Sequence, residues 1–265
     1  MSYTLTLLGT GSSGGVPRIG NDWGACDPRN PKNRRRRCAA LLQRTEGRGT
    51  THVLIDTPPD LRDQLLDVGI GTLDGVLYTH DHADHAHGID ELRIVALNMR
   101  RRIDVHADAA TSATLHTRFG YCFQAPPDSA YPPILNAHTI APPAPVVVHG
   151  AGGSIEVLPV VQQHGDITSL GFRVHNVAYS PDVSGLSDDA VAALAGLDLW
   201  IVDALRYRPH PSHFSVAQAL EWIERVKPKR AILTHLHVDL DYETLRRELP
   251  PHVVPAYDGL AVHFD

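Results

Sequence analysis

The sequence predicts an α/β fold in which two β-sheets stack and helices cover their outer sides. Short runs of β-branched and apolar residues recur along the chain, and each is bounded by Gly, Pro, Asp or Asn, as strands are. Segments with a helical hydrophobic period lie between some of these runs but not between all of them. The order is therefore neither a strict strand–helix alternation nor all-β, and two stacked sheets with outer helices fit it best.

Ten segments are predicted as strands because they are short, apolar or β-branched, and end at turn-forming residues. They cover residues 4–8, 38–43, 52–56, 75–79, 103–106, 154–161, 171–179, 199–202, 230–234 and 259–264. Six further segments repeat apolar side chains at helical spacing. These predicted helices cover residues 59–68, 89–100, 109–119, 188–197, 215–226 and 242–249. In the fifth helix, Ala217, Leu220, Ile223 and Val226 fall roughly on one stripe.

Residues 124–145 hold seven prolines and are predicted as a loop or lid rather than a linker, because strand-like sequence resumes on both sides. No internal repeat or low-complexity tract marks a domain boundary. We therefore expect a single domain over residues 1–265.

The composition excludes several classes of protein. With 43% apolar and 20% charged residues, the 265-residue chain has the usage of a globular protein rather than of a disordered or fibrous one. A net charge of −6 argues against a surface that binds bulk RNA. The cysteines number three, and no signal-peptide pattern or long apolar run is found, so a cytoplasmic protein is expected. The outlying count is histidine, with 17 residues that are clustered.

The densest histidine cluster follows the predicted strand at residues 75–79. There, His80, His82, Asp84 and His85 place four candidate metal ligands within six positions. His80 and His82 project to the same side of an extended loop, because side chains alternate, and can hold one ion. Asp84 and His85 are neighbours, so we expect them to turn toward a second position beside the first. Imidazole and carboxylate suit Zn, Mn or Fe, and the spacing suggests two metals.

This T-H-x-H-x-D-H segment resembles the mark of the metallo-β-lactamase superfamily of metallohydrolases. The resemblance covers nearly the whole chain: residues 4–11 resemble its opening strand and turn, and residues 54–57 its second motif. His164, Asp182 and His235 match the later motifs, in order and each at the end of a predicted strand. The resemblance implies an αββα four-layer sandwich, the metallo-β-lactamase fold, with the site at one edge of the sheets.

The resemblance also implies which residues hold two divalent metal ions, Zn or Mn. One ion would be held by His80, His82 and His164 and the other by Asp84, His85 and His235, with Asp182 bridging them. Asp84 is a candidate catalytic residue as well as a ligand. For each of the last three motif residues, a role as a buried, hydrogen-bonded structural group is the alternative.

The C-terminal half of the sequence narrows the resemblance to one branch of the superfamily. His213, in the segment HPSHFS, precedes a predicted amphipathic helix and resembles a histidine of the phosphodiesterase branch. That branch holds the tRNA 3′-processing endonucleases and, more closely similar, the phosphoribosyl cyclic phosphodiesterases of phosphonate breakdown. The matching histidine there contacts the scissile phosphate and assists the leaving oxygen, so His213 is the second catalytic candidate. An exposed position beside a helix cap, and a competing role for His210, are the alternatives.

Two other features are left open by the sequence. The phosphonate-pathway enzymes carry an extra structural zinc on closely spaced cysteines, whereas this chain has only Cys26 in that region, with His237 near the end. The arginines at residues 34–37 could hold a phosphate monoester, but a solvated strand start is favoured.

Asp56 and Asp203, at strand ends, are candidates for fixing the tautomers of ligand histidines.

These observations lead to one main hypothesis. We expect a metal-dependent phosphodiesterase in which a metal-bridging hydroxide hydrolyses a small cyclic or nucleotide phosphodiester, similar to a phosphoribosyl cyclic phosphate. The alternatives are tRNA or RNA 3′ processing and hydrolysis of a lactone or thioester. A small phosphodiester is the expected partner, and a homodimer is an open alternative to a monomer. Neither a membrane nor a nucleic acid is expected as a partner.

Overall fold

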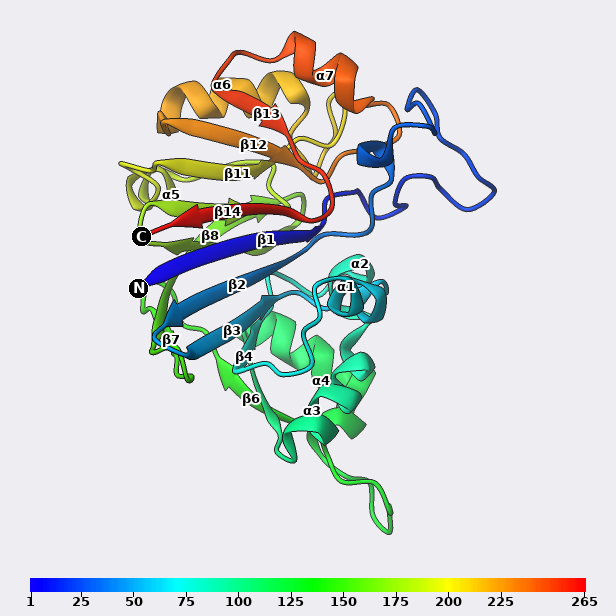
Figure 1. Ribbon diagram of the computed structural model, residues 1–265, viewed down its shortest axis with the longest axis vertical. Helices are drawn as coiled ribbons and strands as arrows, with labels where there is room; N and C mark the ends of the chain where they lie inside the picture. The colour runs from blue at the N-terminus through cyan, green and yellow to red at the C-terminus, as the bar shows by residue number, and fades with distance from the viewer. The chain divides into compact units, whose positions relative to one another are not determined.

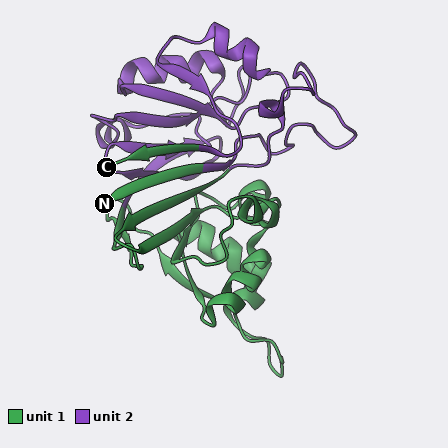
Figure 2. Cartoon of the chain, in the orientation of Figure 1, with its two compact units in different colours: residues 1–6, 39–156, 261–265 green, residues 7–38, 157–260 purple.

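The computed structural model describes residues 1–265 and divides the chain into two compact units (Figure 2). Unit 1 comprises residues 1–6, 39–156 and 261–265, and unit 2 comprises residues 7–38 and 157–260. Each unit is built from segments that are not contiguous in the sequence. The single domain over residues 1–265 stays a prediction.

The first sheet has seven strands in the order β14-β1-β2-β3-β4-β5-β6. Their bounds are β1 Ser2–Gly9, β2 Ala39–Glu46, β3 Gly49–Ile55, β4 Gly75–Leu77, β5 Ile103–Ala107, β6 Leu135–Thr139 and β14 Leu260–Phe264. β2 and β3 form an antiparallel hairpin, whereas the pairs from β3 to β6 are parallel. Because the carboxyl ends of parallel strands meet at one edge of a sheet, the residues that follow β3 and β4 lie together.

The two ends of the chain meet within the first sheet, where β1 and β14 are neighbours (Figure 1). Thr4 Oγ1 lies 2.9 Å from His263 Nδ1, and the rings of Tyr3 and Phe264 stack with centroids 5.4 Å apart. These contacts place residues 261–265 in unit 1.

The helices of unit 1 follow the strands of the parallel part of the sheet. They are α1 Leu61–Asp67, the single-turn α2 Ala83–Ala86, the 3₁₀ turn η2 Ile89–Glu91, α3 Leu92–Met99 and α4 Ala109–Phe123. α4 begins where the Asp108 side chain accepts a hydrogen bond from Thr111 N, and it packs on β6. The helix bends at Phe119, whose φ of −131° and ψ of 32° are not helical. The bend sets the direction of the last residues of α4.

The second sheet also has seven strands, in the order β13-β12-β11-β10-β9-β8-β7. Their bounds are β7 Val146–Val148, β8 Ile155–His164, β9 Ile167–Val174, β10 Val177–Ser180, β11 Leu199–Asp203, β12 Arg230–Thr234 and β13 Val253–Pro255. The pairs from β10 to β13 are parallel, so β10, β11 and β12 also bring their carboxyl ends to one edge.

Three helices of unit 2 cover one face of this sheet: α5 Asp188–Ala193, α6 Val216–Val226 and α7 Tyr242–Glu248, with α6 and α7 beside β12 and β13 in Figure 1. A short 3₁₀ turn, η1 Pro31–Asn33, lies in the same unit. α6 starts with a capping box in which Ser215 and Gln218 satisfy each other's backbone amides. It buries Val216, Ala219, Ile223 and Val226, so the apolar stripe differs from the predicted one at its first two positions.

Two sequence expectations are wrong. The predicted strand at 171–179 is a hairpin, in which β9 and β10 pair antiparallel and His175 takes a positive φ of 51° in the turn. The predicted loop at 124–145 contains β6, an edge strand whose Asn136, His138 and Thr139 are not buried. Neither segment carries the expected signal, because the turn lacks glycine and proline and the edge strand is polar.

The lengths of the helices bear on whether any of them could cross a membrane. The longest helix, α4, has 15 residues, and none of the helices combines the length and apolar character that a bilayer crossing needs.

Candidate functional site

In unit 1, the four predicted ligands of the histidine cluster lie together after β4. His80 and His85 are buried, His82 is exposed, and Asp84 is partly exposed. The His80 ring centroid lies 4.5 Å from that of His82 and 4.4 Å from that of His85. Asp84 Oδ2 is 3.6 Å from His85 Nε2, so these two neighbours converge within the single turn of α2. His80, His82, Asp84 and His85 are therefore close enough to act on common ions.

A buried carboxylate, Asp56, organises this cluster from the end of β3. Its oxygens accept hydrogen bonds from Thr79 N at 2.8 Å, from Thr79 Oγ1 at 2.8 Å and from His85 Nδ1 at 2.7 Å. Because Thr79 Oγ1 donates to Asp56, it accepts from His80 Nδ1, which is 2.9 Å away. Both His80 and His85 thus carry their proton on Nδ1 and keep the Nε2 lone pair for a metal.

The same contacts act on the ionisation of Asp56. Burial raises the pKa of this carboxyl, and the neighbouring His85 and Thr79 hydrogen bonds oppose that rise. The hydrogen bond between Asp56 and His85 Nδ1 is the contact expected of a group that fixes the tautomer of a ligand histidine. Thr79 was not singled out as a functional residue, although the T-H-x-H motif contains it.

The histidine loop is held from its other side by α4. Arg118 Nη1 donates to the carbonyl oxygen of Asp81 at 2.6 Å, and Arg118 Nη2 lies 3.8 Å from the Asp81 carboxylate. The Phe119 ring meets the ring of His87 edge-on, with centroids 5.5 Å apart. The residues at the bend of α4 therefore contact both ends of the segment that carries the ligands.

In unit 2, three predicted ligands and Asp203 lie at or just after the ends of four strands. His164 is the last residue of β8, Asp182 follows β10 by two residues, and His235 directly follows β12, while Asp203 ends β11. Asp182 Oδ2 lies 3.6 Å from His164 Nε2 and 3.5 Å from His235 Nε2. One carboxylate oxygen therefore faces two imidazole nitrogens, as expected of a residue that shares a metal with each of them.

The tautomer of His164 is fixed by the main chain. Its Nδ1 lies 2.6 Å from the carbonyl oxygen of Ser212, which can only accept, so Nδ1 carries the proton and Nε2 faces Asp182. Sequence reasoning missed this contact, since a backbone carbonyl leaves no side-chain pattern to find.

His213 lies among these ligands. Its Nδ1 donates to Asp203 Oδ2 at 2.7 Å, its ring stacks on that of His235 with centroids 4.5 Å apart, and its side chain is 11% exposed. The His164 ring is 4.7 Å away, edge-on. His213 belongs to two sets of mutually close ligand atoms, one with His164 and Asp182 and one with Asp203 and His235. It is therefore not an exposed neighbour of a helix cap.

Asp203 orients His213 rather than a predicted ligand. Besides the His213 bond, its Oδ2 accepts from Val183 N at 3.1 Å, and its Oδ1 is 3.9 Å from His235 Nδ1, beyond a hydrogen bond. Burial raises the pKa of Asp203, and the neighbouring His213 and His235 oppose that rise. His210, the competing candidate, accepts from Ser212 N at 3.3 Å, and its ring is 5.2 Å from that of His213.

The two features that the sequence left open, the arginine run at residues 34–37 and Cys26, meet in unit 2. Arg35 is only 1% exposed, and it donates to Asn33 Oδ1 at 3.2 Å and to Cys26 Sγ at 3.8 Å. Cys26 donates in turn to the carbonyl oxygen of Val238 at 3.3 Å. The solvated arginine run is therefore wrong for Arg35, and a guanidinium occupies the surroundings of Cys26.

The residues in both units fit divalent metal ions. Imidazole Nε2 atoms, with Nδ1 anchored in three of the predicted ligands, and partly or fully buried carboxylates are the donor set of Zn and Mn sites. The match to a metal rests on these donors and on their orientation by Asp56, Thr79 and Ser212.

A family model described as a beta-lactamase superfamily domain matches residues 51–236. The chain belongs to the beta-lactamase superfamily. It has the metallo-β-lactamase fold of metal-dependent hydrolases, as the motifs predict, so the α/β fold class of two mixed sheets with helices is confirmed.

Solved structures place this superfamily member in the predicted branch. It is 35% identical to a diphosphatase from the PhnP family, with a TM-score of 0.89 over 100% of this chain and 98% of that one. Human tRNase Z, short form, has the same fold at 19% identity, with a TM-score of 0.64 over 98% of each chain.

A curated relative is longer than this chain. The octanoyltransferase of Porphyromonas gingivalis is 33% identical over 264 residues, which are 98% of this chain and 51% of that protein. This chain thus spans about half the length of that relative.

Proposed function

We propose that this chain is a metal-dependent phosphodiesterase that hydrolyses a small cyclic or nucleotide phosphodiester. The observation that carries the proposal is the pair of His213 and Asp203, joined at 2.7 Å among the predicted ligands of unit 2. A histidine oriented in this way can give a proton to a leaving alkoxide. The likeness to a PhnP-family diphosphatase supports phosphate chemistry.

We further propose two ions, Zn or Mn, as the cofactors. Their ligands are the residues marked by the motifs: His80, His82, Asp84, His85, His164, Asp182 and His235. Bound divalent cations lower the pKa of water and neutralise charge on phosphoryl oxygens. In this proposal Asp182 would contribute a ligand to both ions, and Asp84 would also take part in catalysis by accepting a hydrogen bond from the attacking water.

The chain's own residues then divide the proton transfers. Asp203 accepts from His213 Nδ1, which leaves Nε2 as the ring nitrogen that acts on the substrate. Protonated at Nε2, His213 donates to the departing oxygen while the carboxylate of Asp203 stabilises the imidazolium. Asp56 and Ser212 O keep His85 and His164 in the tautomer that binds a metal.

The expected partner is a small diester rather than an RNA. The net charge of −6 supports this choice, because proteins that bind RNA nonspecifically depend on an excess of Lys and Arg. The curated relative's name concerns acyl transfer, so an octanoyl thioester is the informative comparison substrate.

The test compares His213→Ala with His210→Ala on two diesters. For a diester with a poor alkoxide leaving group, we expect His213→Ala to lower kcat by about two to four decades, the usual effect of losing a general acid. The kcat for bis-p-nitrophenyl phosphate should fall less, because nitrophenolate departs without a proton. His210→Ala should hydrolyse both diesters at close to the parent rate.

The same experiment can overturn the proposal. Equal losses on both diesters would make His213 a phosphate-binding residue, and loss of metal from His213→Ala would make it a ligand. A parent protein that cleaves the octanoyl thioester but neither diester would replace phosphodiester hydrolysis with acyl chemistry.

A further inference from the structure

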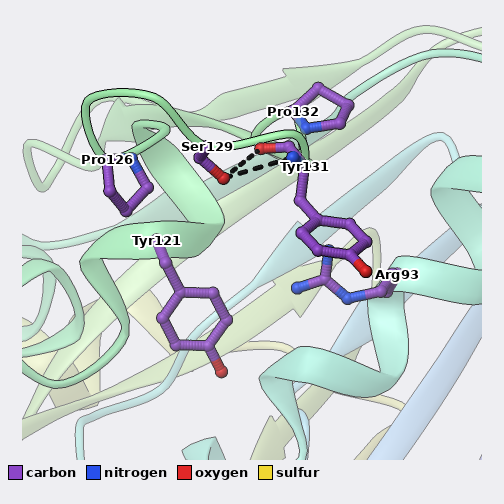
Figure 3. A pocket seen from close by; sticks show the side chains of 6 residues that line it. All are labelled: Arg93, Tyr121, Pro126, Ser129, Tyr131 and Pro132. Carbon is purple, nitrogen blue, oxygen red and sulfur yellow. Dashed lines mark hydrogen bonds between the residues drawn. The ribbon is translucent and has the colours of Figure 1, made fainter.

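A pocket of about 340 Å³ lies in unit 1, outside the histidine cluster (Figure 3). It is formed by the first turn of α3, the end of α4 and the proline-rich loop that follows α4. Its lining residues are Arg93, Tyr121, Pro126, Ser129, Tyr131 and Pro132. The function described above uses none of them.

Two tyrosine rings give the pocket its character. Tyr121 is 45% exposed and Tyr131 is 76% exposed, so both present ring surface to solvent. Figure 3 shows Tyr131 reaching from the loop toward Arg93, while Tyr121 extends from α4. Tyr131 is positioned by Ser129, whose Oγ accepts from Tyr131 N at 3.1 Å and donates to Tyr131 O at 3.2 Å. The local backbone around Tyr131 is thereby fixed.

The charge in the pocket is balanced. Arg93 Nη2 donates to Asp90 Oδ1 at 2.7 Å, and the guanidinium carbon lies 6.0 Å from the Tyr121 ring centroid. A guanidinium already paired with a carboxylate offers a flat stacking surface more than a site for a free anion. Two rings, two prolines and a neutralised guanidinium together suit an uncharged planar ring.

The pocket is built on the same helix that contacts the ligand loop. Tyr121 follows Phe119 by two residues, and Phe119 and Arg118 contact His87 and Asp81 on either side of the ligand segment. The pocket and the histidine cluster are thus connected through the last residues of α4.

We propose that this pocket binds the planar aromatic ring of the substrate, a nucleobase, by stacking on Tyr121 and Tyr131. The ligand class is a nucleotide whose phosphodiester reaches the histidine cluster. That second part rests on the proposed function, whereas binding of the ring does not.

The test measures equilibrium binding by calorimetry to the full-length protein. The probes are adenosine 5′-monophosphate and ribose 5-phosphate, which share the phosphate and differ in the base. We expect the nucleotide to bind at least about tenfold more tightly, as base–aromatic stacking usually gives. Tyr131→Ala and Tyr121→Ala should each reduce this ratio, and Tyr131→Phe should preserve it. Tyr207→Ala, a tyrosine of similar exposure at 43% in unit 2, is the control and should keep the parent ratio.

Equal affinities for the two probes, or a ratio that neither alanine variant changes, would overturn the pocket's role. Loss of the ratio in Tyr207→Ala as well would also overturn it. If the protein hydrolyses no diester but the ratio behaves as expected, the pocket assignment stands and only the proposed reaction fails. If diesters are hydrolysed but the two probes bind with equal affinity, the proposed reaction stands and the pocket assignment fails.

Discussion

Asp56→Asn is expected to weaken metal binding more than it weakens the fold. Asp56 has a positive φ of 65°, a conformation that asparagine also tolerates, so the backbone need not move. The new amide keeps one oxygen as an acceptor but places an NH₂ group where His85 Nδ1 now donates. His85 can answer by moving its proton to Nε2, so that Nδ1 accepts from the amide. The nitrogen assigned to the metal is then the protonated one.

The expected magnitudes follow from these contacts. Asp56 Oδ2 accepts from both His85 Nδ1 and Thr79 Oγ1, and the tautomer change restores only the bond to His85. The free energy of unfolding should therefore fall by about 1–3 kcal/mol, the usual cost of leaving one buried group, here the Thr79 hydroxyl, poorly paired. Loss of a group that orients a ligand histidine typically lowers metal affinity by about 10–100-fold. This corresponds to about 1.4–2.7 kcal/mol of binding free energy.

The assay is a competition titration of the metal-free protein against a chromophoric chelator, with circular dichroism to verify folding. Asp104→Asn is the matched control, since Asp104 accepts from His138 Nε2 at 3.0 Å in the same unit but on an exposed surface. It should keep the parent affinity. Parent-like affinity in a folded Asp56→Asn protein would refute the tautomer argument, as would an equal loss in Asp104→Asn.

Three other predictions test separate features. Asp182→Asn should lower the occupancy of both metal ions in elemental analysis and Asp84→Asn mainly that of one, whereas parent-like metal content in both would contradict the bridge. Burial raises the pKa of Asp258 to about 6, so its contribution to stability falls as the pH rises through about 4 to 6. Urea unfolding should show about 1 kcal/mol more gain from pH 7 to pH 5 in the parent than in Asp258→Asn, and equal gains would refute the shift. Gly24→Ala should destabilise more than Gly20→Ala by about 1–3 kcal/mol, because both have positive φ but only the Gly24 Cβ would lie 2.7 Å from Val238 O. Equal melting temperatures would contradict that clash.

The contiguous part of the site could be predicted from the sequence because its geometry is local. His80 and His82 share a side of an extended loop, and their rings lie 4.5 Å apart as the alternation predicts. Asp84 and His85 were expected to turn toward a second position, and they converge within one turn of α2. His164, Asp182 and His235 were identified only through the order of motifs, because no local rule brings distant strand ends together.

The groups that orient the ligands were only partly predictable. Asp56 ends a strand and carries a charge, which makes it conspicuous, but Ser212 acts through a backbone carbonyl. Arg118 was part of a predicted helix without any mark of its contact to Asp81. The division into two units was also hidden, because neither composition nor hydrophobic period changes where one unit gives way to the other.

The pairing of β1 with β14 bears on the order in which the chain folds. Thr4 and His263 lie 259 positions apart, and their contact closes the sheet of unit 1 only after all of unit 2 has been synthesised. Contacts of such long range are entropically costly to form early and belong to slow folding steps. Until residues 260–264 are available, one side of β1 presents unpaired backbone amides and carbonyls, the kind of edge that recruits other chains. A nascent chain that stalls before this last strand is therefore the species most exposed to aggregation.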